Sequence, residues 1–288
     1  MSALISVVIP VFNGSPHIKD SLESVLQQTH ANMEIVLVDG GSTDGSREWI
    51  FEQSDPRIRA MVMPHGISAA ENWNAASHEA SGEYIKLLCQ DDILYPHALE
   101  QQLSELEAHP NASFAVARRD IVDARGKMLY RNRGLRNMKP GPMTGMTALE
   151  ISYLSGTNNL GEPVAILFRH EALDAVLNWD DQRPFLLDLD LYTKALQTQS
   201  IVVSTNSIGA FRVSSSSWST RLVEEQTNQL RAWQHEVAEI LDPAPTRTKR
   251  IRAELALHQQ SWLRRMAYRV LKLRGNFTSQ GTAGRLTP

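Results

Sequence analysis

The first 110 residues alternate short apolar runs with helical patterns, and this alternation restricts the chain to a small set of folds. Leu4–Ile9, Met33–Val38 and Tyr84–Leu88 are largely apolar runs rich in aliphatic residues. Such runs suit strands that are buried on both faces of a sheet. Helical patterns lie between them, one opened by Pro16 and another ended by Gly82. This alternation predicts an α/β fold with a mostly parallel central sheet and helices on both of its faces.

The later part of the chain has weaker patterns. We expect a loop over Arg131–Gly145, because Arg, Gly, Pro and Met dominate that segment. Pro163–Phe168 and Ile201–Val213 have the composition of strands, and Leu186–Leu196 has the periodicity of a helix. Helical patterns dominate from Ser219 to Leu273, so the chain is expected to end in helices.

Composition and missing motifs exclude several classes of protein. Cys89 is the only cysteine, which excludes an internal disulfide and a zinc site built from cysteines. No apolar run approaches the roughly 18 residues that a membrane span needs. The N-terminus lacks a basic segment before its first apolar run, so we expect a strand there and not a signal peptide. No G-x-G-x-x-G is present, and Ser46 stands where the lysine of a P-loop would follow Gly40 and Gly45.

Polar segments follow three of the expected strands at their carboxyl ends. They are Pro10-Val11-Phe12-Asn13, Asp39-Gly40-Gly41-Ser42 and Gln90-Asp91-Asp92. Open α/β sheets bind their ligands at this edge. The runs VVIPVFNG, LESVLQQTH, EIVLVDGGSTDGS and GEYIKLLCQDDILYP, in this order, resemble glycosyltransferase family two, whose members have the GT-A fold. The resemblance covers residues 4–110 well and residues 160–215 loosely.

This resemblance implies a domain organisation. A single GT-A (Rossmann-like) domain would span residues 1–218, with a nucleotide-binding half at 1–110 and an acceptor half at 111–218. Residues 219–274 would form a helical C-terminal extension. Residues 275–288 would be a disordered tail.

The resemblance also implies a site for a nucleotide-sugar donor. In family members, the segment matching Pro10–Asn13 lies along the base and ribose, and the acid matching Asp39 hydrogen-bonds the uracil ring. Asn72 matches a residue near the diphosphate, next to Glu71, where many relatives carry an arginine. Ser42–Asp44 is equally well explained as a helix cap. The expected donor-binding residues are Pro10, Val11, Phe12, Asn13, Asp39, Ser42, Asn72, Gln90, Asp91 and Asp92.

A divalent cation is implied as the cofactor, because the departing diphosphate carries charge that Mn²⁺ or Mg²⁺ commonly neutralises. Family members hold this ion with an Asp-x-Asp element, and Cys89-Gln90-Asp91 occupies that place here. Asp91 matches the last acid of the element and is the expected metal ligand. Asp92 would set the turn or contact the sugar. Alternatively, the two acids cap the helix that follows.

The catalytic base implied by the resemblance is Asp188. An inverting transferase needs a carboxylate that takes the proton of the acceptor hydroxyl. Family members carry this acid in a Glu-Asp pair at the start of a helix, and Leu187 replaces the Glu here. Helical spacing offers Lys194 as a surface partner to Asp190, which leaves Asp188 as the inward acid. Alternatively, Asp188 only complements the helix dipole. Ser214 replaces a histidine of the family, and such substitutions fit a divergent subgroup or an inactive protein.

The C-terminal segment is basic. Residues 247–288 contain ten Lys or Arg and one acid, which is a net charge of +9. Because the whole chain has a net charge of −3, the first 246 residues carry −12. Ser261–Arg274 reads as a basic amphipathic helix with Trp262, Met266 and Val270 on its apolar stripe. Such a helix can lie on an anionic membrane surface or pack its stripe on the domain. Nucleic-acid binding is not expected, because the rest of the chain is acidic.

Together, these features predict an inverting glycosyltransferase. It would move a sugar from a nucleotide-diphosphate donor, a UDP-sugar, to a hydroxyl of a glycan or lipid-linked acceptor in the synthesis of cell-surface polysaccharide. The protein would be cytoplasmic, with a peripheral contact to the membrane. Two alternatives stay open at this stage: a non-catalytic nucleotide-sugar-binding module, and a nucleotidyltransferase. The second usually needs a glycine-rich basic loop after the first strand, and Val11-Phe12-Asn13-Gly14 is not one.

Overall fold

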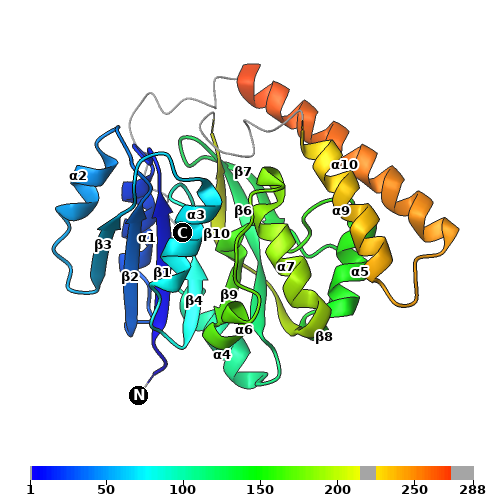
Figure 1. Ribbon diagram of the computed structural model, residues 1–288, viewed down its shortest axis with the longest axis horizontal. Helices are drawn as coiled ribbons and strands as arrows, with labels where there is room; N and C mark the ends of the chain where they lie inside the picture. The colour runs from blue at the N-terminus through cyan, green and yellow to red at the C-terminus, as the bar shows by residue number, and fades with distance from the viewer. Residues whose placement is uncertain (1, 215–224, 274–288) are drawn as a thin grey trace.

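One large sheet runs through the centre of the molecule, with helices packed on both of its faces (Figure 1). The computed structural model describes residues 2–214 and 225–273. The elements of the first 110 residues are β1 (Ile5–Val11), α1 (Ile18–Leu26), β2 (Met33–Asp39), α2 (Ser46–Phe51), β3 (Ile58–Val62), α3 (Ala69–His78), β4 (Tyr84–Leu87), β5 (Ile93–Leu94) and α4 (Ala98–Ala108). The later elements are β6 (Phe114–Asp123), β7 (Met128–Arg133), β8 (Gly141–Thr144), α5 (Gly145–Ser155), η1 (Pro163–Ala165), β9 (Ile166–Arg169), α6 (His170–Asp174), η2 (Pro184–Leu186), α7 (Leu187–Thr198), β10 (Ser200–Val213), α9 (Gln226–Ile240) and α10 (Arg247–Leu273).

The strand order is β3-β2-β1-β4-β9-β6-β10-β5, with β7 paired to β6 and β8 paired to β10. The strands from β3 to β4 are parallel, and so is the long β6–β10 pairing. Strand β9 joins the two parallel groups by antiparallel pairing on both sides. One apolar core lies under α1 and α4, and the other lies under α3, α5 and α7. The predicted α/β class with one mostly parallel sheet and C-terminal helices is confirmed.

Pro10 continues β1 beyond the apolar run Leu4–Ile9. Strand β1 pairs with β2 up to Val11, where the Gly40 N–H donates to the Val11 carbonyl over 2.7 Å. On its other side, pairing with β4 stops at Val8, whose carbonyl accepts from Leu88 N–H. Because successive residues of a strand face alternate neighbours, Pro10 faces the side where β4 has ended. Its missing N–H therefore costs no ladder hydrogen bond.

The second half of the sheet holds the strands that the sequence did not reveal. Strands β7 and β8 lie inside or beside the segment expected to be a loop, and the predicted strand at 163–168 begins as the 3₁₀ turn η1. Four of the six residues of β7 are exposed, so no apolar alternation marks it. Pairing with the long buried strand β6 fixes its conformation instead, a case of tertiary contacts overriding local pattern.

The C-terminal helices α9 and α10 pack on α5 and α7 (Figure 1). Trp233 of α9 is fully buried and donates its indole N–H to Thr193 Oγ1 over 2.8 Å. Helix α10 crosses the end of α5 closely, because a Cβ on Gly156 would lie 2.3 Å from the backbone nitrogen of Leu257. The predicted boundary at residue 218 and the tail at 275–288 lie outside the described residues.

Candidate functional site

A cavity of about 1240 Å³ opens at the carboxyl ends of β1 and β4. Its other walls come from the start of α3, the β6–β7 hairpin, the start of α7 and one side of α10. Pockets for small molecules and cofactors measure roughly 300–1,000 Å³, so this one has room for more than one substrate. Seven of the expected site residues line the cavity, namely Pro10, Phe12, Asn13, Asn72, Gln90, Asp91 and Asp188.

Hydrogen bonds tie the strand-end loops into one platform. The side-chain amide of Gln90 pairs with the backbone of Phe12, accepting from its N–H over 2.8 Å and donating to its carbonyl over 2.9 Å. Asn13 N–H donates to Ser42 Oγ, and Asn72 Nδ2 donates to the Val11 carbonyl. The polar side chains expected to bind a donor therefore also fix the loops that would cradle it. Ser42 and Val11 are buried in this platform and do not line the cavity.

Asp39 lies beneath the platform and does not line the cavity either. Its carboxylate accepts from the N–H groups of Gly41 and Ser42 at 3.1–3.2 Å and from Arg47 Nε at 2.9 Å. The side chain folds back on its own loop, as an Asx-turn does. Asp39 is expected from the resemblance to hydrogen-bond a uracil ring, and its carboxylate is buried in this structure. Its Oδ1 accepts one hydrogen bond, at 3.2 Å, and could accept a second hydrogen bond from a ligand.

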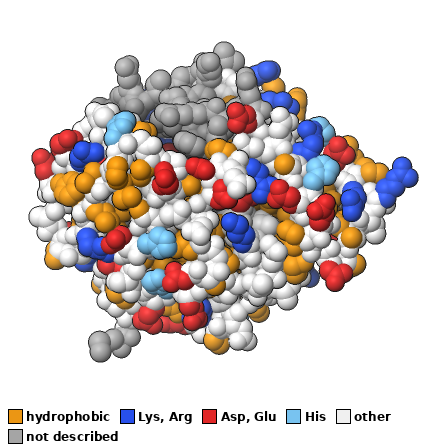
Figure 2. Space-filling view, in the orientation of Figure 1, with side chains coloured by type: hydrophobic (Ala, Val, Ile, Leu, Met, Phe, Trp, Pro, Cys, Tyr) orange, Lys and Arg blue, Asp and Glu red, His pale blue; other side chains and the backbone are white. Residues whose placement is uncertain are grey.

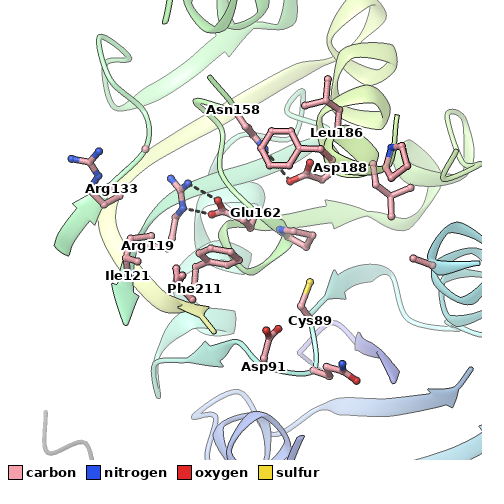
Figure 3. Close-up of a pocket in the computed structure, with 18 of the residues that line it drawn as sticks. Cys89, Asp91, Arg119, Ile121, Arg133, Asn158, Glu162, Leu186, Asp188 and Phe211 are labelled. Atoms are coloured by element: carbon pink, nitrogen blue, oxygen red, sulfur yellow. Dashed lines mark hydrogen bonds and ion pairs between the residues drawn. The ribbon is translucent and has the colours of Figure 1, made fainter. Parts of the chain in front are cut away.

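Asp91 and Cys89 point into the cavity from the loop after β4 (Figure 3). Burial, together with the carboxylates of Asp92 and Asp91, raises the pKa of the Cys89 thiol well above its usual value. A neutral thiol is a poor ligand for Mn²⁺ or Mg²⁺, which prefer oxygen. Within residues 2–214 and 225–273, no group of three His, Cys, Asp or Glu is placed to hold a metal. A cation here would take Asp91 and complete its shell with oxygens of the substrate, as Mg²⁺ commonly does.

Asp92 does not reach the cavity, which corrects the expectation that it could contact the sugar. It is fully buried, and its Oδ1 accepts from the backbone N–H of Arg212 over 3.1 Å. Burial, with Asp91 as a neighbour, raises its pKa well above the usual value. Arg212 also donates to the Asp91 carbonyl over 2.9 Å. These contacts assign Asp92 to the turn that presents Asp91.

Asp188 begins α7 on the opposite wall of the cavity. Its Oδ2 accepts from Asn158 Nδ2 over 2.9 Å, and its Oδ1 accepts from Leu189 N–H over 2.7 Å. Burial, followed by the nearby Glu162 carboxylate, raises the pKa of Asp188 from 3.8 to about 8. Glu162 is itself paired with Arg119, whose Nη2 donates over 3.0 Å. Figure 3 shows this pair beside the Asn158–Asp188 contact.

The prediction that Lys194 pairs with Asp190 is wrong. Arg183, and not Lys194, pairs with Asp190 through two contacts of 2.9 and 2.8 Å. Arg183 comes from the loop before η2, which folds over the first turn of α7, and sequence spacing cannot reveal such a partner. Asp188 lies in the cavity lining and Asp190 lies outside it. Ser214 is also buried and outside the lining.

Three cavity residues escaped the sequence analysis: Asn158, Glu162 and Arg119. Asn158 also binds the backbone of Gly161 through both its amide atoms, which holds the loop that carries Glu162 next to Asp188. The polar run Thr157-Asn158-Asn159 ahead of an apolar segment was the available signal. Arg119 lies in a buried strand, where its charge gave no hint of a partner 43 residues away.

Comparison with known proteins agrees with this geometry. The model of the family described as "Glycosyl transferase family 2" matches residues 6–177, more than half of the chain. The chain belongs to glycosyl transferase family 2. An uncharacterized glycosyltransferase of Rickettsia bellii is 28% identical over 200 residues, which are 69% of this chain and 28% of that protein. The Escherichia coli UDP-Glc:alpha-D-GlcNAc-diphosphoundecaprenol beta-1,3-glucosyltransferase WfgD is 36% identical over 120 residues, which are 42% of this chain and 47% of that one.

Solved structures of glycosyltransferases share the fold of this family 2 member. Staphylococcus aureus TarS 1–349 in complex with UDP-GlcNAc has a TM-score of 0.63 at 15% identity, over 88% of this chain and 70% of that one. The mannosyltransferase PcManGT of Pyrobaculum calidifontis, in complex with GDP-Man and Mn²⁺, has a TM-score of 0.56 at 14% identity, over 95% and 81%. At these identities the likeness shows the fold alone. The matched region spans less than half of the length of the two relatives named above.

Replacing Asp188 with asparagine should change how stability depends on pH. A carboxyl whose pKa is raised on folding stabilises the protein while protonated and loses that contribution as pH rises through the folded pKa. The Tm of Asp188→Asn relative to the wild type should therefore climb between about pH 4 and pH 8 and level off above, given the pKa of about 8. Thermal unfolding followed by circular dichroism at several pH values measures this.

The matched control for this measurement is Glu107→Gln, a charge removal at an exposed position of α4. Its Tm difference from the wild type should stay flat over the same pH range. A flat difference for Asp188→Asn as well would mean that Asp188 titrates as an ordinary acid.

Proposed function

We propose that this protein transfers a sugar, with inversion, from a UDP-sugar to a hydroxyl of a glycan or lipid-linked acceptor in the synthesis of cell-surface polysaccharide. One observation carries the proposal. Asp91 and Asp188 face one cavity from different walls, the first at the strand-end platform and the second with a pKa of about 8. A donor held at the platform would present its anomeric carbon between them, with the leaving group toward Asp91.

The donor would lie along the loop that follows β1. Phe12 is 47% exposed at this loop and offers a ring face to the base. Asp39 would accept a hydrogen bond from the uracil ring through Oδ1. Because Asp39 is buried, the loop between Gly40 and Ser42 would have to move for this contact to form. The choice of uridine is supported by the similarity to WfgD, a UDP-Glc glucosyltransferase, and to TarS, which has been solved in complex with UDP-GlcNAc.

A Mn²⁺ or Mg²⁺ ion would be held by Asp91 together with the donor diphosphate. The complex of PcManGT with Mn²⁺ supports a divalent cation in this fold. When bound, the ion supplies positive charge to the departing diphosphate. Cys89 is given no part in holding it, because Mn²⁺ and Mg²⁺ prefer oxygen ligands to sulfur.

Asp188 would act as the general base. It takes the proton from the acceptor hydroxyl while that oxygen bonds to the anomeric carbon and the bond from this carbon to the diphosphate breaks, releasing UDP. A carboxylate with a raised pKa is the stronger base, provided that it is ionised. The Asn158 amide, hydrogen-bonded over 2.9 Å, would hold the carboxylate in place as the proton arrives.

Alanine at Asp188 tests this role. Loss of a general base should lower the transfer rate by roughly 10²–10⁴-fold. Affinity for UDP, measured by isothermal titration, should stay within about twofold of the wild type, because Asp188 lies on the wall across from the platform. Asp181→Asn removes another cavity-lining carboxylate and serves as the matched control. Full turnover by Asp188→Ala would show that another residue is the base. No turnover by the wild type or by either variant would favour a non-catalytic binding module.

Asp91→Asn tests the metal. UDP should bind wild-type protein much more tightly with Mn²⁺ than without it, and the variant should lose this difference while keeping the metal-independent affinity. Cys89→Ala is the matched control from the same loop and should behave as the wild type. Equal UDP binding with and without Mn²⁺ in the wild type would contradict the role of Asp91, although it would leave the donor site in place.

The exposed side of α10 is proposed to contact the cytoplasmic face of an anionic membrane. Trp262, Met266 and Val270 are 57%, 38% and 40% exposed along the helix, beside Arg265 and Arg269. Figure 2 shows Lys and Arg side chains gathered along the edge that α10 occupies. Another side of α10 lines the cavity, so a docked helix would bring the site to the bilayer surface. In the described part of the chain, no helix is apolar over a span long enough to cross a bilayer.

Vesicle sedimentation tests this contact. The wild type should co-sediment with vesicles containing phosphatidylglycerol and not with pure phosphatidylcholine. Trp262→Ser with Met266→Ser should reduce the bound fraction severalfold, whereas Phe51→Ser, an equally exposed apolar residue on α2, should not. Loss of binding in both variants, or in neither, would remove α10 from the contact.

A further inference from the structure

The wall of the cavity formed by the β6–β7 hairpin is strongly basic. Arg118 and Arg119 of β6, Arg133 at the end of β7 and Arg136 in the following loop all line the cavity. Arg119 is neutralised by Glu162. Within residues 2–214 and 225–273, Arg118, Arg133 and Arg136 form no ion pair with a carboxylate. Three cations of this wall therefore face the cavity without a counter-charge.

Arg118 has a side-chain donor that lacks a hydrogen-bond acceptor in the described part of the chain. Its Nε is buried and has no hydrogen-bond partner among the described residues. Buried donors are nearly always paired, so an unpaired guanidinium nitrogen at a cavity wall points to a ligand that supplies the acceptor. The same residue also lines a smaller neighbouring cavity, whose other charged lining residues are Arg131 and Asp120.

The backbone holds these charges together despite their repulsion. Arg119 and Arg133 are direct partners in the β6–β7 register, a like-charge pairing that destabilises a sheet. Asn132, Leu135 and Asn137 have φ values of 53°, 54° and 63°, in the left-handed region that non-glycine residues rarely adopt. Asn159 clamps the loop by accepting from Arg136 N–H over 2.9 Å and donating to its carbonyl over 3.0 Å. Strained, over-determined loops of this kind are typical of ligand sites.

The basic wall is separate from the place proposed for the donor diphosphate. That diphosphate belongs at Asp91 and the loops after β1 and β4, whereas the arginines come from β6, β7 and the loop after β7. In Figure 3, Arg133 lies on the side of Arg119 that faces away from Asp188 and Asp91. An anion bound there would belong to the other substrate.

We propose that Arg118, Arg133 and Arg136 form a binding site for a phosphate group of the acceptor, so that the acceptor is a phosphate ester and not a neutral glycan. This inference rests on the proposed function, because it names the second substrate of the same cavity. Guanidinium groups bind phosphate oxygens in pairs, which suits a site made of arginines rather than lysines. The phosphate has two sources of the same chemistry, the diphosphate of a lipid carrier and the phosphodiester of a polymer.

Titration of UDP-saturated protein tests the site, because saturation fills the donor diphosphate position first. The probes are decyl diphosphate for the lipid source, a glycerol phosphate trimer for the polymer source and decyl glucoside as the neutral comparison. At least one phosphate probe should bind, and the double variant Arg133→Gln/Arg136→Gln should bind it about tenfold more weakly or worse. UDP affinity should not change in that variant.

Arg125→Gln is the matched control, since Arg125 is exposed in the same hairpin but does not line the cavity. Arg133 and Arg136 are exposed as well, so their variants should fold. Failure of both phosphate probes to bind, equal binding by the double variant, or equal binding of decyl glucoside would overturn the proposal. A loss of UDP affinity in the double variant would reassign the arginines to the donor. Absence of UDP binding to the wild type would instead contradict the proposed donor site. The same phosphate titrations, run without UDP on the wild type and the double variant, would then decide the arginine site.

Discussion

The ion pair between Arg119 and Glu162 is the contact on which the site depends. It joins a buried strand to the loop before β9, and it divides the cavity between the base and the basic wall. From beneath, Lys86 fixes the same loop: its fully buried Nζ donates to Gln102 Oε1 over 2.8 Å and to the Val164 carbonyl over 2.6 Å. Burial lowers the pKa of Lys86 well below its usual value. The Arg119 ion pair and the Lys86 hydrogen bonds together hold Glu162 near Asp188, where the charge of Glu162 helps to raise the pKa of Asp188.

The departures from the family pattern have local physical explanations. Glu71, in the place of an arginine, completes a capping box with Ser68 that begins α3: each side chain accepts from the other residue's backbone N–H. Cys89 lies near four acidic residues, and burial together with these acids raises the pKa of its thiol. The positive charge of the cavity is concentrated on the β6–β7 hairpin. Asp91 lines the cavity at the proposed position of the leaving group, and Asp188 lines it at the proposed position of the acceptor hydroxyl.

Much of the donor half could be read from the sequence, because strands buried on both faces and their polar ends leave a periodic signal. Asp91 and Asp188, which were chosen from the resemblance and, for Asp188, from helical spacing, both line the cavity. Strand β7 could not be read, since its exposed residues carry no pattern and its conformation is set by β6. Likewise, Arg183 was missed as the partner of Asp190, because a folded loop, and not helical spacing, brings them together.

By itself, the sequence determined the α/β class, the edge of the sheet where ligands bind, and the acids placed there. These follow from local periodicity and from the rule that parallel strands end at a common edge. Only the tertiary structure decided which polar atoms reach the cavity. It buried Asp39 and Asp92 in their own loops, and it brought Asn158, Glu162 and the arginines of the hairpin to the cavity. Desolvation and side-chain pairing depend on residues far apart in the chain, so no local pattern records them.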